Sequence, residues 1–192
     1  MTFAELQVDA VAVLTGWQPP DAAQAALREA FLGFLAAGDE HLDATSRSCV
    51  AGHLTASAVV LDGDGRAVLL TLHPRVGRWL QLGGHCEDGD STLAGAALRE
   101  ATEESGIDGL ELVGSPVHLD VHPITCSLGV PTRHFDVRYL VVAPPAAVAR
   151  MSAESDDLAF WPVDGLPADT DTSTREAVAA ALTSSRNSRA NH

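Results

Sequence analysis

A helix-forming segment near the middle of the chain carries four charged side chains whose spacing suits metal-ion chemistry. The stretch LREATEESG, residues 98–106, contains Arg99, Glu100, Glu103 and Glu104. Because residues three and four apart share one face of a helix, the three carboxylates project from one arc. Glutamates at these spacings repel one another, and in a last turn they also oppose the helix dipole. A divalent cation such as Mg²⁺ would resolve this conflict, since hard cations bind carboxylate oxygens.

A glycine-rich turn, GGHCEDGD at residues 83–90, precedes this helix. Gly83 and Gly84 allow backbone conformations or a close ligand approach that a Cβ would prevent. The competing interpretation is a solvated acidic face. Against it, the cluster borders a stripe of small apolar residues and has Arg99 as its one interleaved cation. The pattern predicts a helix that is capped by Asp90 or Ser91 and ends at Gly106.

Taken together, residues 83–107 resemble the Nudix box, whose pattern is Gly-x5-Glu-x7-Arg-Glu-U-x-Glu-Glu-x-Gly-U with U aliphatic. The second half of the box matches from Arg99 to Ile107, although alanine stands at the U position after Glu100. In the first half, Asp90 replaces the glutamate, and eight residues instead of seven separate it from Arg99. We interpret this as a loop lengthened by one residue. The resemblance covers roughly residues 50–183.

The resemblance implies an α/β fold, a Nudix-type α/β/α sandwich with a mixed β-sheet. It also implies hydrolysis of a pyrophosphate bond in a nucleoside diphosphate derivative, with Mg²⁺ or Mn²⁺. Carried over by position, Glu103 and Glu104 are metal ligands, and Glu100 is a ligand or the base that activates water. Arg99 orients the acidic cluster, and the carbonyl of Gly84 completes the metal sphere.

Residues outside the box supply further candidates. Many Nudix enzymes use another carboxylate from a later loop, and Glu154 is the best placed by order, with Asp156 and Asp157 competing. A plain solvated loop is the alternative at this place.

Substrate contacts are expected just before and within the glycine turn. Arg75 and Arg78 match the geometry of phosphates. Trp79 stacks on a base or packs as a core aromatic, and His85 is the favoured histidine for substrate contact.

Two further patterns suggest transition-metal sites. His118, Asp120 and His122 share one face if their segment is a strand, but a fourth ligand is not identified. Cys49 and His53 form a weaker zinc half-site, because a buried cysteine is usually only packed.

The elements that must position these residues follow from hydrophobic patterning. Two helices are expected before about Asp43, broken at Pro19 and Pro20, with Asp21 capping the second. The pattern predicts strands at 54–62, 67–74, 78–84, 110–124, 132–143 and 157–163, and a last helix from about 172. We therefore predict an N-terminal helical extension (1–48), a hydrolase domain (49–184) and a disordered tail (185–192).

Composition limits the partners. The 192 residues carry 26 acidic and 12 basic groups, a net charge of −14, and lysine does not occur. Such a surface repels nucleic acid and anionic membranes. Three cysteines without a CxxC spacing and the absence of a signal-type opening lead us to expect a reduced, cytoplasmic protein. No apolar run approaches the roughly 18 residues of a membrane span.

The sequence therefore predicts a pyrophosphohydrolase that requires a divalent metal and acts on a small diphosphate. Two alternatives stay open: an enzyme resembling isopentenyl diphosphate isomerase, and a nucleotide sensor without catalysis. The isomerases place a catalytic cysteine before the Gly-His turn, whereas Cys86 here follows His85. The N-terminal helices are left open as a homodimer interface or a lid.

Overall fold

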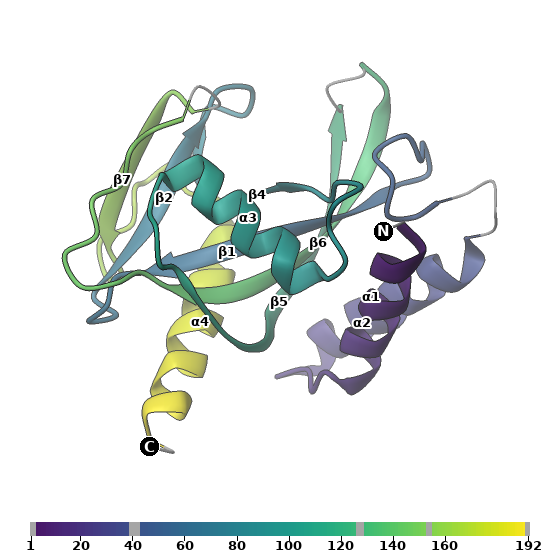
Figure 1. Cartoon of the computed structure of the whole chain (residues 1–192), viewed down its shortest axis with the longest axis horizontal. Helices are drawn as coiled ribbons and strands as arrows, with labels where there is room; N and C mark the ends of the chain where they lie inside the picture. Colours follow the sequence, from purple (N-terminus) through teal and green to yellow (C-terminus); the bar gives the residue numbers. More distant parts are fainter. Residues whose placement is uncertain (1–2, 39–42, 126–128, 153–154, 191–192) are drawn as a thin grey trace. The chain divides into compact units, whose positions relative to one another are not determined.

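The computed structural model describes residues 3–38, 43–125, 129–152 and 155–190. Eleven elements follow one another in these residues (Figure 1): α1 (Phe3–Gly16), α2 (Ala22–Ala37), β1 (His53–Leu61), β2 (Ala67–His73), β3 (Arg78–Leu80), β4 (Leu82–His85), α3 (Leu93–Ser105), β5 (Glu111–Thr125), β6 (Pro131–Val142), β7 (Asp157–Pro162) and α4 (Thr172–Ala190). The chain divides into two compact units. One comprises Met1–Ala56, Gly84–Ala96 and Leu119–Val137, and the other comprises Ser57–Gly83, Ala97–His118 and Arg138–His192.

A seven-stranded sheet confirms the predicted α/β class. Its strand order is β3-β2-β1-β6-β5, with β4 pairing with β1 and β7 pairing with β2. The predicted hairpin is present, because β1 and β2 run antiparallel with Val60 opposite Leu69. Its turn is closed by Asp62, whose carboxylate accepts the backbone N–H of Arg66 at 2.7 Å. The strand predicted at 78–84 is instead two strands, since β3 pairs with β2 and β4 with β1.

Within the second unit, helices cover both faces of the sheet, as the predicted sandwich requires. Because strand residues alternate in direction, Val59 and Leu61 of β1 pack with Ala177 and Ala181 of α4. Val60, the residue between them, packs with Ala101 of α3 on the opposite face. The small side chain of Ala101 lets the helix backbone approach the sheet. The carboxylate-bearing helix is thereby held by its apolar stripe.

Helix α3 ends as predicted but begins differently. Gly106 has φ +61°, and its N–H donates to the carbonyl of Thr102 at 2.8 Å. At the other end the predicted caps are wrong. Thr92 caps the helix, because its hydroxyl accepts the N–H of Gly95 at 3.0 Å. Asp90 is used elsewhere: its carboxylate accepts the N–H of Glu87 at 2.8 Å and closes the lengthened loop.

Helix α4 begins at Thr172 as predicted but continues to Ala190. The disordered tail predicted from residue 185 is therefore corrected, because residues 185–190 are helical; residues 191 and 192 lie outside the described residues. Arg189 gives the physical reason: its guanidinium donates to the carbonyls of Gly63 at 3.0 Å and Asp64 at 3.2 Å. These two carbonyls belong to the β1–β2 turn, so a contact distant in sequence stabilises the last turns.

Two N-terminal helices are present as predicted, and Asp21 caps the second by accepting the N–H of Gln24 at 2.8 Å. In their own unit, Phe34 stacks on Phe135 of β6 with ring centroids 4.1 Å apart. The domain boundary at residues 48 and 49 stays a prediction. Within the described part of the chain, no helix is both long enough and apolar enough to cross a membrane.

Candidate active site and a histidine cluster

The carboxylates of α3 are organised by one guanidinium. Arg99 Nη1 lies 3.0 Å from Glu100 Oε1 and 3.0 Å from Glu103 Oε2. Glu100 is the next residue along the helix and Glu103 lies one turn later, so Arg99 fixes the two carboxylates relative to each other. This is the arrangement expected of a residue that orients ligands without replacing them.

The third carboxylate is held by the glycine turn. Glu104 Oε2 accepts the backbone N–H of Gly83 at 3.0 Å. Gly83 has φ +150°, and a Cβ at this position would lie 2.6 Å from the Cα of Ser57. Only glycine fits so close to β1, and this close approach aims the N–H at Glu104.

Burial distinguishes the three carboxylates. Glu100 and Glu104 are each 9% exposed, whereas the side chain of Glu103 is 60% exposed. Ionised carboxylates are rarely buried without compensating charge, and Arg99 supplies positive charge to Glu100 and Glu103. A hard cation with oxygen ligands fits this donor set better than a solvated acidic face does.

The residues predicted for substrate contact fall into two groups. Arg75 and Arg78 are exposed beside the strand pair β2–β3, with Arg78 opposite His73. Trp79 is 8% exposed and packs edge-to-face against Trp161, with centroids 5.2 Å apart. Its predicted role in stacking on a base is therefore corrected, since the ring belongs to the core. Glu154 lies outside the described residues.

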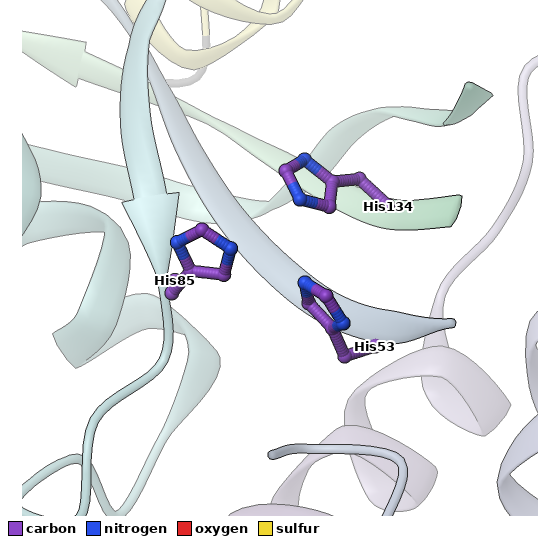
Figure 2. A group of neighbouring side chains, drawn as sticks. All are labelled: His53, His85 and His134. Atoms are coloured by element: carbon purple, nitrogen blue, oxygen red, sulfur yellow. The ribbon is translucent and has the colours of Figure 1, made fainter. Parts of the chain in front are cut away.

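Three histidines from three strands gather in the first unit, as Figure 2 shows: His53 at the start of β1, His85 at the end of β4 and His134 in β6. Each offers a ring nitrogen, and these nitrogens all lie within 4.8 Å of one another. The ring centroids are separated by 4.9 to 5.0 Å. We call these residues the histidine cluster.

Two nitrogens of the histidine cluster have no hydrogen-bond partner among the described residues. They are the buried Nε2 atoms of His53 and His134. Burying a polar atom without a partner costs about 1–3 kcal/mol. The other nitrogen of His53, Nδ1, lies 3.4 Å from the carbonyl of Cys49, which favours a proton on Nδ1 and a lone pair on Nε2.

Electrostatics keep two of these rings neutral. Burial, followed by the neighbouring His85, His122 and His53, lowers the pKa of His134 to about 3. Burial also lowers the pKa of His53, and the nearby Arg47 acts in the same direction. Neutral imidazole is the form that donates a lone pair to a metal.

Sequence reasoning pointed to different groupings of histidine. His118 Nε2 lies 3.8 Å from a carboxylate oxygen of Glu176, whereas His122 Nδ1 lies 2.7 Å from Asp120 Oδ2. The predicted site of His118, Asp120 and His122 is therefore corrected: His118 and His122 contact different carboxylates, and among the described residues the three do not form a group of possible metal ligands. Cys49 is buried and approaches His53 through its carbonyl, not its thiol. No local sequence signal places His53 and His134 beside His85, because their proximity depends on which strands are neighbours.

The chain is similar to known proteins of one family. A family model described as "NUDIX domain" matches residues 52–182. No curated protein matches the chain. Among solved structures, a NUDIX family hydrolase from Clostridium perfringens is 21% identical, covering 69% of this chain and 95% of that chain, with a TM-score of 0.52.

Two further solved structures share the fold. The dihydroneopterin triphosphate pyrophosphohydrolase from E. coli is 22% identical, over 68% of this chain and 94% of that chain, with a TM-score of 0.56. An Ap4A hydrolase from C. elegans is 18% identical, over 72% of this chain and 98% of that chain, with a TM-score of 0.52. At these identities the likeness establishes the fold, and the residues of the site must carry the chemistry.

Proposed function

The chain belongs to the Nudix family, and we propose that it is a pyrophosphohydrolase, which uses Mg²⁺ or Mn²⁺ to hydrolyse a nucleoside diphosphate derivative or a similar small diphosphate. One observation carries the proposal. Arg99 contacts Glu100 and Glu103, while Glu104 is fixed by the N–H of Gly83. Three oriented carboxylates beside a glycine turn are a donor set for a hard cation.

In this proposal, the charged residues of α3 have different roles. Glu103 and Glu104 hold the cation, and Glu100 serves as a further ligand or as the base that takes a proton from water. Arg99 keeps Glu100 and Glu103 in place through its contacts of 3.0 Å. Gly84 directly follows Gly83 in the chain, and its carbonyl is the remaining candidate ligand. When bound, the cation neutralises charge on the phosphoryl oxygens and helps to position an attacking water.

Substrate binding requires positive charge on a strongly acidic protein. The net charge is −14, so a diphosphate is repelled unless local cations attract it. Arg75 and Arg78 are exposed in the segment that leads to β4, where their guanidinium groups can bind phosphate oxygens. We assign them to phosphate binding. The related structures are named as an Ap4A hydrolase and a dihydroneopterin triphosphate pyrophosphohydrolase, so a substrate panel should include nucleotides and pterin triphosphates.

The test is release of phosphate or nucleotide from a diphosphate panel with Mg²⁺ or Mn²⁺. Glu103→Gln is the variant of choice, because the exposed side chain keeps its shape and loses its charge. We expect turnover to fall by about 100-fold or more. Mutation of a residue that only supports a metal ligand typically lowers activity by about 10- to 100-fold, so a direct ligand should cost at least as much. Glu111→Gln removes one exposed carboxylate at the start of β5 and should leave turnover unchanged.

Three outcomes would contradict the proposal. An equal loss of turnover in Glu103→Gln and Glu111→Gln would mean that the overall negative charge of the protein affects turnover, and that the α3 carboxylates have no special role. Tight nucleotide binding without turnover would favour the sensor. Isomerisation of isopentenyl diphosphate without phosphate release would favour the isomerase, although Cys86 is buried at 3% exposure.

A further inference from the structure

We propose that the histidine cluster is a second metal site, which binds a transition-metal ion of the Zn²⁺ class through His53, His85 and His134. The proposal concerns a different ion from the hard cation assigned to α3. Imidazole nitrogen suits Zn²⁺ and similar ions, whereas Mg²⁺ takes oxygen ligands.

The spacing of the cluster suits one ion. Ligand nitrogens at about 2.0–2.1 Å from a tetrahedral Zn²⁺ lie roughly 3.4 Å from one another. The three ring nitrogens of the histidine cluster lie within 4.8 Å of one another, so they need to approach by at most about 1.4 Å. Rotation of the three rings, which already face a common space in Figure 2, can supply that movement.

The orphaned nitrogens point to the ligand. The buried Nε2 atoms of His53 and His134 lack hydrogen-bond partners among the described residues, although native proteins usually satisfy such atoms. A metal ion accepts their lone pairs. His53 also has the support typical of a ligating histidine, because its Nδ1 lies 3.4 Å from the Cys49 carbonyl.

Further polar side chains surround the histidine cluster. The ring of His122 lies 5.2 Å from that of His134 and is oriented by Asp120, 2.7 Å from its Nδ1. Asp136, two residues beyond His134, accepts the hydroxyl of Thr55 at 2.9 Å and acts electrostatically on His134. Carboxylates behind histidine ligands are a common feature of zinc sites. Three protein ligands leave a fourth coordination position for water or an anionic oxygen.

The alternative is a set of packed histidines without a ligand. That interpretation explains the burial of His53. It does not explain why, among the described residues, the Nε2 atoms of both His53 and His134 are buried without a hydrogen-bond partner in the same cluster. It also gives no reason for three strands, β1, β4 and β6, each to contribute a histidine at that point. A metal ion accounts for both observations.

The test measures metal binding directly, so it does not depend on hydrolase activity. Tag-free full-length protein is stripped with a chelator, dialysed and titrated with Zn²⁺ or Co²⁺ in the presence of excess Mg²⁺. We expect one Zn²⁺ per chain by elemental analysis, visible d–d bands of four-coordinate Co²⁺, and X-ray absorption showing nitrogen at about 2.0–2.1 Å.

His85→Ala is the main variant, since His85 is half-buried, and it should weaken Zn²⁺ binding by about 100-fold or more. His134→Gln serves as a second variant. Two controls, His73→Ala at the end of β2 and Glu103→Gln in α3, should stay within about twofold of wild type.

Wild-type protein that binds Zn²⁺ no more tightly than His85→Ala would overturn the inference. So would loss of Zn²⁺ in Glu103→Gln with retention in His85→Ala, because the ion would then occupy the carboxylate site. The wild-type spectra decide the question even if His134→Gln fails to fold. Zinc binding by a protein without hydrolase activity would refute only the proposed function.

Discussion

Replacing Gly83 by alanine should destabilise the protein strongly, although the change adds a single methyl group. Gly83 has φ +150°, a backbone conformation that side-chain-bearing residues rarely adopt. The new Cβ would also lie 2.6 Å from the Cα of Ser57, which is backbone and cannot rotate away. Ser57 belongs to β1, the strand with which β4 pairs, so relief requires the two strands to separate.

The expected loss of stability is the sum of the backbone cost and the cost of the steric clash. A residue held in a disfavoured backbone region costs of order 1–3 kcal/mol, and overpacking adds typically 1–3 kcal/mol. We therefore expect the free energy of unfolding to fall by roughly 2–6 kcal/mol. For a chain of this size, the melting temperature should fall by at least about 4 °C. Urea unfolding followed by circular dichroism measures the loss.

Substitutions at two other glycines separate the backbone cost from the steric cost. Gly77 has φ +64° with open space where a Cβ would lie, so Gly77→Ala should cost only the backbone term, about 1–2 kcal/mol. Gly89 has open space and no positive φ, so Gly89→Ala should stay within about 0.5 kcal/mol of wild type. Ser57→Gly should rescue Gly83→Ala only in part, because it removes the side chain and leaves the Cα. If Gly83→Ala unfolds at the same urea concentration as Gly77→Ala, the steric reasoning is refuted.

Four further predictions concern separate parts of the molecule. Arg99→Lys keeps the charge but loses the geometry that contacts two carboxylates at once, so steady-state kinetics should show kcat lowered by about 10- to 100-fold; unchanged kcat would remove Arg99 from the site. Asp21→Ala removes the cap of α2 and should cost about 1 kcal/mol in urea unfolding, whereas Asp21→Asn should restore most of it. Ser173→Ala removes a hydroxyl 2.7 Å from the buried guanidinium of Arg138, and thermal unfolding should reveal a loss of about 1.5–3 kcal/mol. Zn²⁺ at 100 times its dissociation constant should stabilise the metal-stripped protein by about 2.7 kcal/mol, or roughly 5–11 °C by differential scanning calorimetry, and His85→Ala should abolish that shift.

Local sequence patterns were enough to group the carboxylates of α3, because the geometry that brings them together is local. Residues three and four apart on one helix must share a face, so Glu100, Glu103 and Glu104 could be grouped without knowledge of the fold. The contacts of Arg99 lie within the same turn and a half of helix. Gly106 likewise predicted the end of α3, since tolerance of a positive φ is a property of the residue.

Features that depend on distant contacts could not be predicted. The carboxylate of Asp90 could accept a backbone N–H either from the first turn of α3 or from its own loop. In the structure it accepts the N–H of Glu87, which lies in the lengthened loop. The helical end of α4 depends on carbonyls of the β1–β2 turn that Arg189 reaches across more than a hundred residues. The histidine cluster depends on β4 and β6 both lying beside β1, an order that no local pattern encodes.

The side chain of Gln24 on α2 takes the place of a missing strand. Its amide accepts the N–H of Leu119 at 2.7 Å and donates to the carbonyl of Leu119 at 3.1 Å, as a neighbouring peptide group would. Leu119 lies in β5, where the strand order ends. Open strand edges are templates on which other chains aggregate. Helix α2 thus occupies backbone groups of β5 at Leu119 that another chain could otherwise pair with.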